Sequence, residues 1–268
     1  IEVFDSKSKE EIELIKKEVS IAGRLLTIRL MGNSAFANLH DDSGKIQIYL
    51  QKKHVGDTTY KLFKAIDLGD IVGVKGEIFK TKTGELTINV NSMVLLSKSL
   101  RPLPEKFHGI SDVEIKYRQR YLDLMTNPAS KEVFLKRSMI INHIRNFFIN
   151  HNYTEVETPM MHQIPGGANA KPFVTHHNSL DIDLYLRVAP ELFLKRCIIG
   201  GFENVFEINR SFRNEGLSIK HNPEFTMIEF YSAYENYEYL INFIEQLFKS
   251  LCKLLSIGET YSYQDNNI

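Results

Sequence analysis

Residues 206–231 read FEINRSFRNEGLSIKHNPEFTMIEFY, and this stretch decides the fold of the second half of the chain. Apolar and polar residues alternate at both of its ends, which is typical of β-strands with one buried face. The residues between these ends are mostly polar and include Pro223. The stretch therefore predicts two strands, over 204–213 and 224–231, joined by a charged loop.

Charged side chains stand in unusual places within this stretch. The second strand would place Phe225, Met227, Glu229 and Tyr231 on one face. A carboxylate on such a face is costly unless a cation meets it. Arg213, at the end of the first strand, supplies a cation whose planar guanidinium suits the oxygens of a polyphosphate. Taken alone, such a set of charges is also typical of a surface hairpin with a solvated loop.

Composition limits the possible functions. The 268 residues are 43% hydrophobic and 25% charged, as in a globular protein of one large domain or two ordinary ones. Lysine plus arginine and aspartate plus glutamate both number 33, which excludes a polybasic nucleic-acid coat, so any RNA contact needs a local patch or base stacking. Cys197 and Cys252 form no CxxC pair, which fits the reducing cytoplasm. No apolar run reaches the ~20 residues of a membrane helix.

The first half of the chain is dominated by strand signals. Turn-forming clusters separate the predicted strands, which cover 19–30, 35–40, 45–50, 71–79 and 86–96. A segment with helical spacing, 58–66, lies between the third and fourth strands, and a charged helix over 9–17 precedes the first. Five strands with a helix in this place predict an OB-fold barrel. Another small β-barrel or an open sheet is the alternative.

After residue 98 the pattern changes. Residues 98–111 contain Pro102, Pro104 and Gly109 and are typical of a linker. Beyond the linker, apolar residues recur at helical spacing over 112–124, 131–150 and 237–255, and shorter strand-like segments cover 153–158 and 185–187. With the two strands of the opening stretch, this predicts an α+β domain with an antiparallel sheet.

Several motifs carry a family resemblance. FRNE at 212–215 followed by HNPEF at 221–225 resembles motif 2 of class II aminoacyl-tRNA synthetases. YTEVETP at 153–159 resembles their motif 1, which ends in a proline. PGGA at 165–168, YLRVAPELFLKR at 185–196 and RQRYLDL at 118–124 resemble lysyl-tRNA synthetases of the bacterial type in particular. The resemblance covers nearly the whole chain.

The resemblance implies a domain plan and a reaction. The plan is an OB-fold anticodon-binding domain over 1–98, a linker over 99–125, and a class II catalytic domain over 126–268 with motifs 1 and 2. In the reaction, lysine attacks the α-phosphate of ATP to give lysyl-adenylate, and the lysyl group then passes to the 3′ end of tRNA(Lys). Members of the family are homodimers through motif 1, which places Pro159 at the interface.

For ATP, the resemblance implies a role for each residue of the motif 2 loop. Arg213 would be the catalytic residue, in contact with the α-phosphate and the lysine carboxylate. Glu215 would hold the adenine amino group, and Phe225 would stack on the adenine ring. His221 and Asn222 would support the phosphates.

The lysine pocket can be argued from charge as well as resemblance. A buried ammonium requires carboxylate partners, for which Glu191 and Glu229 are the candidates, with Tyr231 adding a hydroxyl. Gly167 would let the backbone approach the substrate amino group. Alternatively, Glu191 is a first-turn acid of a helix that follows Pro190. Aspartyl- and asparaginyl-tRNA synthetases share the layout, but an aspartate side chain needs a cation where this chain offers acids.

The resemblance also assigns an anticodon-binding set in the OB domain. Phe36 would stack on a central uridine, Gln47 and Glu85 would hydrogen-bond base edges, and Arg29 would contact the backbone. The alternatives are that Phe36 is a core aromatic of the barrel and that Glu85 is a turn residue.

The third motif of the family and its magnesium ligands are absent before Ile268, so magnesium ligands are expected beyond that residue. No metal site is expected in this segment, because His176 and His177 have no third ligand at zinc spacing. We expect the segment alone to fold its OB domain but to lack synthetase activity. The alternatives are a module that only binds the anticodon, or a paralogue that lysylates a protein, although such paralogues lack an OB domain.

Overall fold

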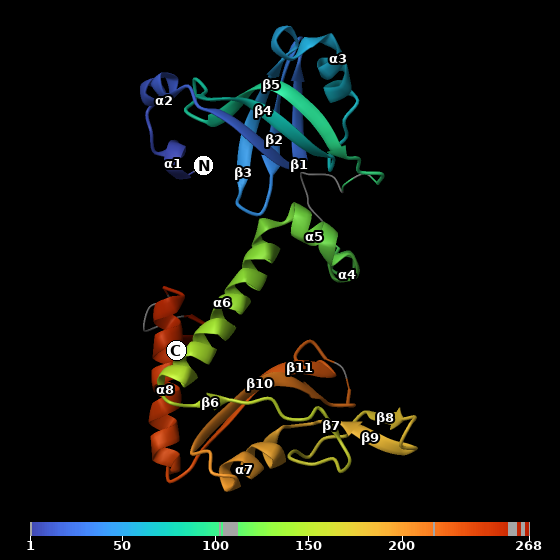
Figure 1. Cartoon of the computed structure of the whole chain (residues 1–268), viewed down its shortest axis with the longest axis vertical. Coiled ribbons are helices and arrows are strands. Elements are labelled where there is room, and N and C mark those ends of the chain that lie inside the picture. The colour runs from blue at the N-terminus through green and yellow to red at the C-terminus, as the bar shows by residue number, and fades with distance from the viewer. Residues whose placement is uncertain are drawn as a thin grey trace. The chain divides into compact units, whose positions relative to one another are not determined.

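The protein is described by a computed structural model that covers residues 2–101, 103, 112–216, 218–256, 262–263 and 266–267. Contacts divide the chain into two compact units, Ile1–Ser130 and Lys131–Ile268 (Figure 1). Each unit is described by itself below.

The first unit is a closed five-stranded barrel. Its strands are β1 (Glu18–Met31), β2 (Ser34–His40), β3 (Lys45–Gln51), β4 (Ile71–Lys80) and β5 (Leu86–Ser97). They pair in the order β1-β2-β3-β5-β4, and β4 returns to β1 to close the barrel. Only β3 and β5 run parallel. The OB-fold prediction and the five predicted strands are therefore confirmed.

Alternation of inward-facing and outward-facing residues along the strands builds the barrel core. In β2, Ala35, Ala37 and Leu39 point inward and are buried, while the residues between them lie on the outer surface. Helix α2 (Lys9–Ile15) begins with a capping box between Ser8 and Glu11 and adds the fully buried Ile12 to the same core. A single turn, α1 (Glu2–Asp5), precedes it.

The helix between the third and fourth strands is longer than predicted. Helix α3 spans Lys52–Lys64, with a kink at Gly56, whose φ of 80° is left-handed. This glycine interrupts the apolar spacing, so that only the part after it was recognisable as a helix over 58–66. Tyr60 and Phe63 fix the helix to the barrel through their buried rings.

The second part of the predicted linker is helical. Helices α4 (Val113–Arg118) and α5 (Arg120–Thr126) follow each other with a break at Gln119, where φ is −120° and ψ is 55°. Asp112 caps α4 by accepting hydrogen bonds from the amides of the first turn. Pro102, Pro104 and Gly109 lie outside the described residues, as do 265 and 268 near the end of the chain.

The central sheet of the second unit is mixed, so the prediction of an antiparallel sheet is wrong at one edge. Strands β10 (Asn204–Phe212) and β11 (Glu224–Ser232) pair antiparallel, but β6 (Thr154–Glu155) pairs parallel to β10. Nearly fifty residues separate β6 from β10, which is enough chain for the crossover that a parallel pair requires. The strand predicted over 153–158 is reduced to these two paired residues.

A small antiparallel sheet extends the unit. It has the order β7-β9-β8, with β7 (Met161–His162), β8 (Val174–His177) and β9 (Ile182–Leu186). The strand predicted over 185–187 thus starts earlier and ends at Leu186. A further short pair, β12 (Ser262–Tyr263) with β13 (Asn266–Asn267), lies near the end of the chain.

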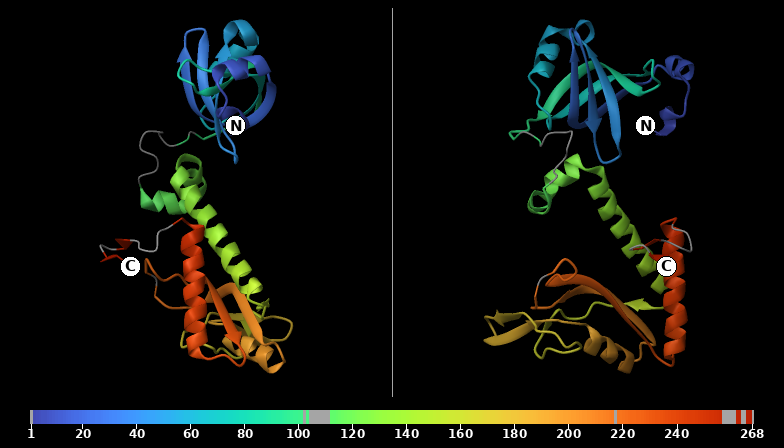
Figure 2. Two further views of the ribbon diagram at one scale, coloured as in Figure 1. Left: turned by 90° about the vertical axis from the view of Figure 1, so that its left-hand side faces the viewer. Right: turned by 180° about the vertical axis from the view of Figure 1, so that it is seen from behind.

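Residue parity separates the two faces of the central sheet. Even-numbered residues such as Phe206 and Phe230 pack in an aromatic cluster centred on Phe148 of α6 (Pro128–Asn150). Helix α8 (Tyr237–Leu254) adds Phe243 to this cluster, and Figure 2 shows the ribbons of the two helices side by side. Odd-numbered residues face the other way, towards α7 (Glu191–Ile199), because Lys195 of that helix lies over the ring of Tyr231. The odd face therefore carries the charged residues that the sequence singled out.

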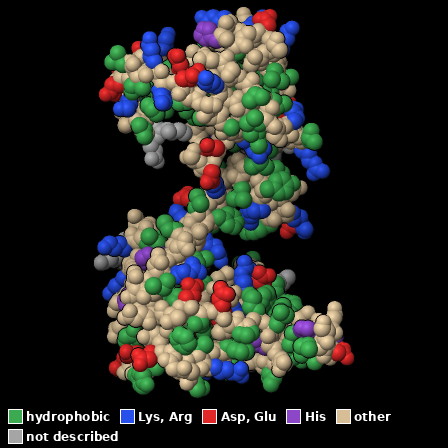
Figure 3. Space-filling model, in the orientation of Figure 1, with side chains coloured by type: hydrophobic (Ala, Val, Ile, Leu, Met, Phe, Trp, Pro, Cys, Tyr) green, Lys and Arg blue, Asp and Glu red, His purple; other side chains and the backbone are tan. Residues whose placement is uncertain are grey.

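The surface carries both signs of charge. Figure 3 shows basic and acidic side chains interspersed on the visible face of each unit. Within the described residues, no helix has the length and apolar character needed to cross a membrane.

Candidate functional site

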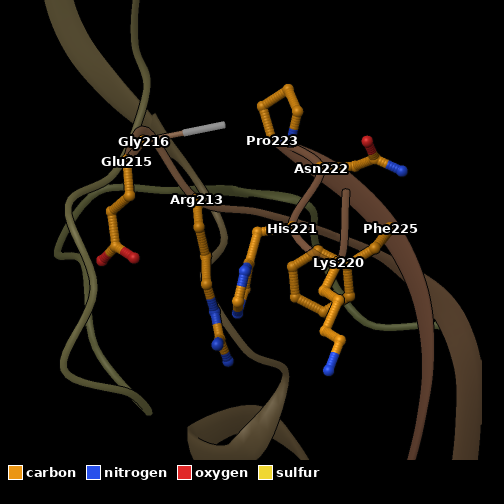
Figure 4. A pocket seen from close by; sticks show the side chains of 8 residues that line it. All are labelled: Arg213, Glu215, Gly216, Lys220, His221, Asn222, Pro223 and Phe225. Atoms are coloured by element: carbon orange, nitrogen blue, oxygen red, sulfur yellow. The ribbon is translucent and has the colours of Figure 1, made fainter. Parts of the chain in front are cut away.

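The loop between β10 and β11 encloses a pocket of about 450 Å³. Its lining consists of Arg213, Glu215, Gly216, Lys220, His221, Asn222, Pro223 and Phe225 (Figure 4). The sequence had predicted a role for five of these residues, and the structure brings all five to one pocket. Lys220 was not predicted, although a lysine between two motif 2 segments was visible in the sequence.

Arg213 lines this pocket, and both its backbone and its side chain are fixed by contacts. Its backbone amide donates a 2.8 Å hydrogen bond to the carbonyl oxygen of Pro223, which closes the loop. Its guanidinium stacks on Phe225, with 5.1 Å from Cζ to the ring centroid. The buried Nε has no hydrogen-bond partner among the described residues. A buried donor without an acceptor is costly, so this nitrogen is suited to bind an anion that enters the pocket.

The other loop residues are fixed by short local bonds. Ser218 and His221 exchange backbone hydrogen bonds of 3.2 Å, and the Ser218 hydroxyl lies 2.7 Å from His221 Nδ1. Glu215 accepts a long 3.4 Å bond from the Lys171 amide. Figure 4 shows Arg213, Lys220 and His221 extending to the same side, whereas Asn222 turns away from them. The pocket thus presents three basic groups and one carboxylate, a set that suits a polyphosphate.

A second cluster lies along the same face of β11, and it is acidic. Tyr231 donates a 2.7 Å hydrogen bond to Oε1 of Glu229. Burial raises the pKa of Glu229; the Tyr231 hydroxyl opposes this rise, and the carboxylates of Glu191 and Glu207 add to it. Glu229 stands four positions after Phe225, so the two clusters are roughly 13 Å apart along the strand.

Helix α7 supplies the second carboxylate of this acidic cluster. Glu191 stands in its first turn and is bound by Nζ of Lys195 at 2.6 Å. Gly167, with φ 87°, packs so closely that a Cβ there would lie 3.2 Å from Cβ of Glu191. Lys195 also lies 5.9 Å from the ring centre of Tyr231. The structure therefore brings together Gly167 and three other predicted lysine-binding residues, and it adds Lys195, which was not predicted from the sequence. The fifth predicted residue, Arg213, lies in the basic pocket instead.

A buried ion pair, Arg187 with Glu207, lies next to the acidic cluster. Arg187 Nη1 and Glu207 Oε1 are 2.6 Å apart, and both side chains are almost completely buried. The hydroxyl of Thr158 donates to the other oxygen of Glu207 at 2.6 Å. Glu207 pairs directly across from Glu229 in the β10–β11 register, so both carboxylates lie on one face. No role was predicted for this pair from the sequence, because only the folded chain brings its members together.

Polar atoms without partners gather on this odd-numbered face. Among the described residues of the second unit, the buried side-chain atoms with no hydrogen-bond partner are Arg187 Nη2, Ser211 Oγ and Arg213 Nε. Ser211 pairs across from Phe225, beside the pocket. Native proteins rarely leave such atoms unpaired, so their position on one face indicates a surface built to receive a polar ligand.

The barrel brings the four predicted RNA-contacting residues onto its outer surface. Arg29 and Phe36 are register partners on β1 and β2. Gln47 donates a 2.9 Å hydrogen bond to Glu85, and its own oxygen accepts one from Thr87. Phe36 is half-buried and outward-facing, and it is absent from the core cluster. The alternative of a core aromatic is therefore wrong for Phe36.

Two further predictions concern the interface and metals. Pro159 is exposed after β6, and its carbonyl oxygen lies 2.8 Å from Nε2 of His162. In the described parts of the chain, no three His, Cys, Asp or Glu side chains are placed to hold a metal ion. His176 instead lies 3.0 Å from Asp183 on the exposed β8–β9 hairpin.

Comparisons with known proteins agree with these observations. The profile of an OB-fold nucleic acid binding domain matches residues 19–96, and that of tRNA synthetases class II (D, K and N) matches residues 112–265. A lysine–tRNA ligase of Thiobacillus denitrificans is 58% identical over 98% of this chain and 52% of its own length. One of Edwardsiella ictaluri is 55% identical over 98% of this chain and 52% of its own length.

The chain thus spans about half the length of the curated relatives it matches. The synthetase match includes the whole β10–β11 hairpin, with its basic pocket and acidic cluster, and it covers more than half of the chain. On these grounds, the chain belongs to the class II tRNA synthetases that serve aspartate, lysine and asparagine.

Proposed function

We propose that this chain provides the anticodon-binding domain and one wall of the active site of a lysine–tRNA ligase. The observation that carries the choice of lysine is the pair of carboxylates, Glu191 and Glu229, beside the hydroxyl of Tyr231. A substrate ammonium would be stabilised there by charge, whereas an aspartate side chain would meet two acids.

In the proposed activation step, an oxygen of the lysine carboxylate attacks the α-phosphorus of ATP and pyrophosphate leaves. Arg213 contacts the α-phosphate and neutralises the charge that builds on its oxygens, with its ring partner Phe225 under the adenine. His221 and Asn222 support the phosphates, and Glu215 holds the adenine amino group. Enzymes of the family use magnesium with ATP, and no magnesium ligand is assigned to the described residues.

Lysine enters this site by exchange with an internal cation. Lys195 neutralises Glu191 in the chain as it stands, with a 2.6 Å ion pair that is about half exposed on the lysine side. The substrate ammonium takes the place beside Glu191 and Glu229, and Lys195 moves to solvent on its flexible stem. Gly167 leaves room for the backbone to meet the substrate amino group.

The proposed RNA partner is tRNA(Lys), bound through the outer surface of the barrel. Phe36 stacks on a central base of the anticodon, while Gln47 and Glu85 hydrogen-bond base edges and Arg29 meets the backbone. We also propose a homodimer, with Pro159 of motif 1 at its interface. The two free cysteines fit a cytoplasmic location.

Amino-acid binding tests this assignment directly. Titration of the chain with lysine, aspartate and asparagine, followed by calorimetry, should give binding for lysine only. Glu229→Gln should weaken lysine binding by about 2 kcal/mol, because the ammonium loses a charged partner. Affinity should fall as pH drops through the raised pKa of Glu229, because the protonated acid cannot pair with the ammonium.

The matched control is Glu224→Gln, which removes an exposed carboxylate of the same strand and should leave lysine binding unchanged. For the complete enzyme, ATP–pyrophosphate exchange should depend on lysine. Exchange that depends on aspartate and not on lysine would refute the proposed substrate.

A further inference from the structure

Lys195 of helix α7 lies among the carboxylates of the acidic cluster. Its Nζ is 2.6 Å from Oε1 of Glu191 and 5.9 Å from the ring centre of Tyr231. The Tyr231 hydroxyl in turn donates a hydrogen bond to Glu229. One ammonium, one aromatic ring and two carboxylates therefore form a connected group in the place where we propose that lysine binds.

The local structure directs Lys195 towards Glu191. The two residues stand four positions apart on α7, with the acid nearer the start of the helix, which is the favourable order for such a pair. Leu194, between them and Gly200 in the chain, is completely buried and fixes the helix to the rest of the unit. A Cβ at Gly167 would lie 3.2 Å from Cβ of Glu191, so the neighbouring loop closes off one side of that acid.

A second pair in the same unit shows how this one differs from an ordinary surface ion pair. Lys249 and Glu245 of α8 have the same spacing and the same 2.6 Å separation. The Glu245 side chain is 55% exposed, whereas that of Glu191 is only 31% exposed. Lys195 also lies over an aromatic ring, which attracts a cation further. The Lys195 ammonium is thus held more firmly than a solvated surface lysine.

The charges of the cluster depend on this ammonium. Glu229 is half-buried and forms no ion pair with any other residue that the structure describes. The positive charge of Lys195 acts on it as well as on Glu191. A lysine side chain consists of four methylene groups and an ammonium, both in a protein and in the free amino acid. A substrate lysine that enters the cluster therefore displaces a group identical to its own side chain.

We propose that Lys195 is a tethered competitor of the substrate, which occupies the lysine pocket while no substrate is bound and lowers its affinity for lysine. The proposal rests on the proposed lysine site and adds what sets its affinity and selectivity. Exchange of one ammonium for another gains little free energy. The other contacts of the substrate, such as that of its carboxylate with Arg213, then decide whether it binds, so amines without an amino-acid backbone are excluded.

Calorimetric titration of the 268-residue chain with lysine tests the competitor. Lys195→Met keeps the apolar stem and removes the charge, and it should bind lysine about fivefold more tightly, because the ion pair leaves the pocket open in roughly one molecule in five. Lys195→Arg keeps the charge and should bind lysine like the unaltered chain. n-Butylamine, which is the lysine side chain without its backbone, should bind Lys195→Met but neither of the other two proteins.

The pH dependence of lysine binding gives a second readout. Burial raises the pKa of the Glu229 carboxyl; Glu191 of α7 and Glu207 of β10 add to the rise, whereas the Tyr231 hydroxyl and Lys195 oppose it. Without the charge of Lys195 this pKa rises further. The fall in lysine affinity on acidification should therefore begin at a higher pH in Lys195→Met than in the unaltered chain, a shift that loss of a merely structural contact would not produce.

Lys249→Met is the matched control, because it breaks the equivalent pair of α8 and should leave lysine binding unchanged. An equal gain in affinity for Lys249→Met and Lys195→Met would refute the competitor, since the gain would then follow from net charge alone. The competitor is also refuted, and the lysine pocket stands, if Glu229→Gln weakens lysine binding while Lys195→Met binds lysine no more tightly than the unaltered chain. If neither the unaltered chain nor Lys195→Met binds lysine, the proposed lysine site itself fails.

Discussion

The residues proposed for recognition are placed differently relative to the core in the barrel and in the central sheet of the second unit. In the barrel, both edges of every strand are paired, the core is mostly apolar, and the predicted RNA contacts lie on the outer surface. In the second unit, Glu229 lies on the same sheet face as the buried Arg187–Glu207 pair. The residues proposed for recognition thus lie on the outer surface of the barrel, whereas in the second unit they share a sheet face with a buried ion pair.

The two units also differ in where their buried polar atoms without hydrogen-bond partners lie. In the barrel, the buried side-chain atoms without partners among the described residues are Oδ1 of Asn38 and of Asn89, on strands β2 and β5. Both residues alternate with buried core residues and so belong to the outer surface. In the second unit, the comparable atoms include Nη2 of the fully buried Arg187. Changes at recognition residues should therefore cost the second unit more stability than the barrel.

The largest expected effect comes from breaking the buried pair. Arg187→Met should lower the unfolding free energy of the second unit by about 3–5 kcal/mol, because it leaves Glu207 charged and buried without its partner. The barrel should keep its stability. Hydrogen exchange measured by mass spectrometry across a denaturant series reports both units separately, since peptides from 19–96 and from 131–256 can be followed in one sample.

The control for this change is Arg210→Met, which removes an exposed ion pair between Arg210 of β10 and Glu224 of β11. It should cost less than about 1 kcal/mol. Equal losses for Arg187→Met and Arg210→Met would show that burial does not decide the effect.

A smaller loss is expected for the buried acid of the barrel. Asp70 is fully buried and accepts bonds from the Ser99 amide at 2.6 Å and from Lys98 at 2.9 Å. Burial alone would raise its pKa, but these bonds outweigh it, so the pKa is lowered. A lowered folded pKa gives stability that is present above the unfolded value of about 3.9 and is lost as pH falls through the folded value.

Asp70→Asn should therefore destabilise the barrel by about 2 kcal/mol at pH 7. In urea denaturation, the difference from the unaltered chain should shrink below about pH 4. Asp67→Asn is the milder comparison, because Asp67 shares Lys98 but is largely exposed. A difference that stays constant from about pH 7 to about pH 3 would mean that the Asp70 charge is not responsible.

The smallest expected change in stability accompanies a clear change in binding. Phe36→Ala should weaken binding of the anticodon stem-loop by about 1–2 kcal/mol and leave ATP binding unchanged. Phe225→Ala should do the reverse, because its ring supports Arg213 in the other unit. Fluorescence titrations with labelled hairpin and with an ATP analogue would measure both. Loss of both ligands in either variant would contradict the division between the units.

The strands of the barrel and the β10–β11 hairpin were predictable from sequence because their signals are local. Alternation and turn residues fix each strand, and the shared face of Phe225, Glu229 and Tyr231 follows from parity. Whether Phe36 points inward or outward stayed open until the folded barrel placed it outside the core. The family motifs then located the basic pocket. Helix α3 was only partly predicted, because the left-handed Gly56 breaks its pattern near the start.

The parts that could not be predicted depend on distant contacts. Arg187 directly follows β9 and Glu207 lies in β10, and nothing in either segment shows that their side chains meet. The parallel β6–β10 pair depends on a long crossover, so strand alternation alone suggested an antiparallel sheet. Lys195 was within the quoted motif, but its ion pair with Glu191 needs the helix that both share.

The two faces of strand β11 have different compositions. Its even-numbered residues, such as Phe230, belong to the aromatic core, and its odd-numbered residues, such as Glu229, lie on the opposite face, where we propose that ligands bind. A substitution changes one side chain, but deletion of one residue within 225–228 would reverse the facing of the residues after it and turn the Glu229 carboxylate towards the aromatic core. This part of the strand should therefore tolerate substitutions far better than changes of length.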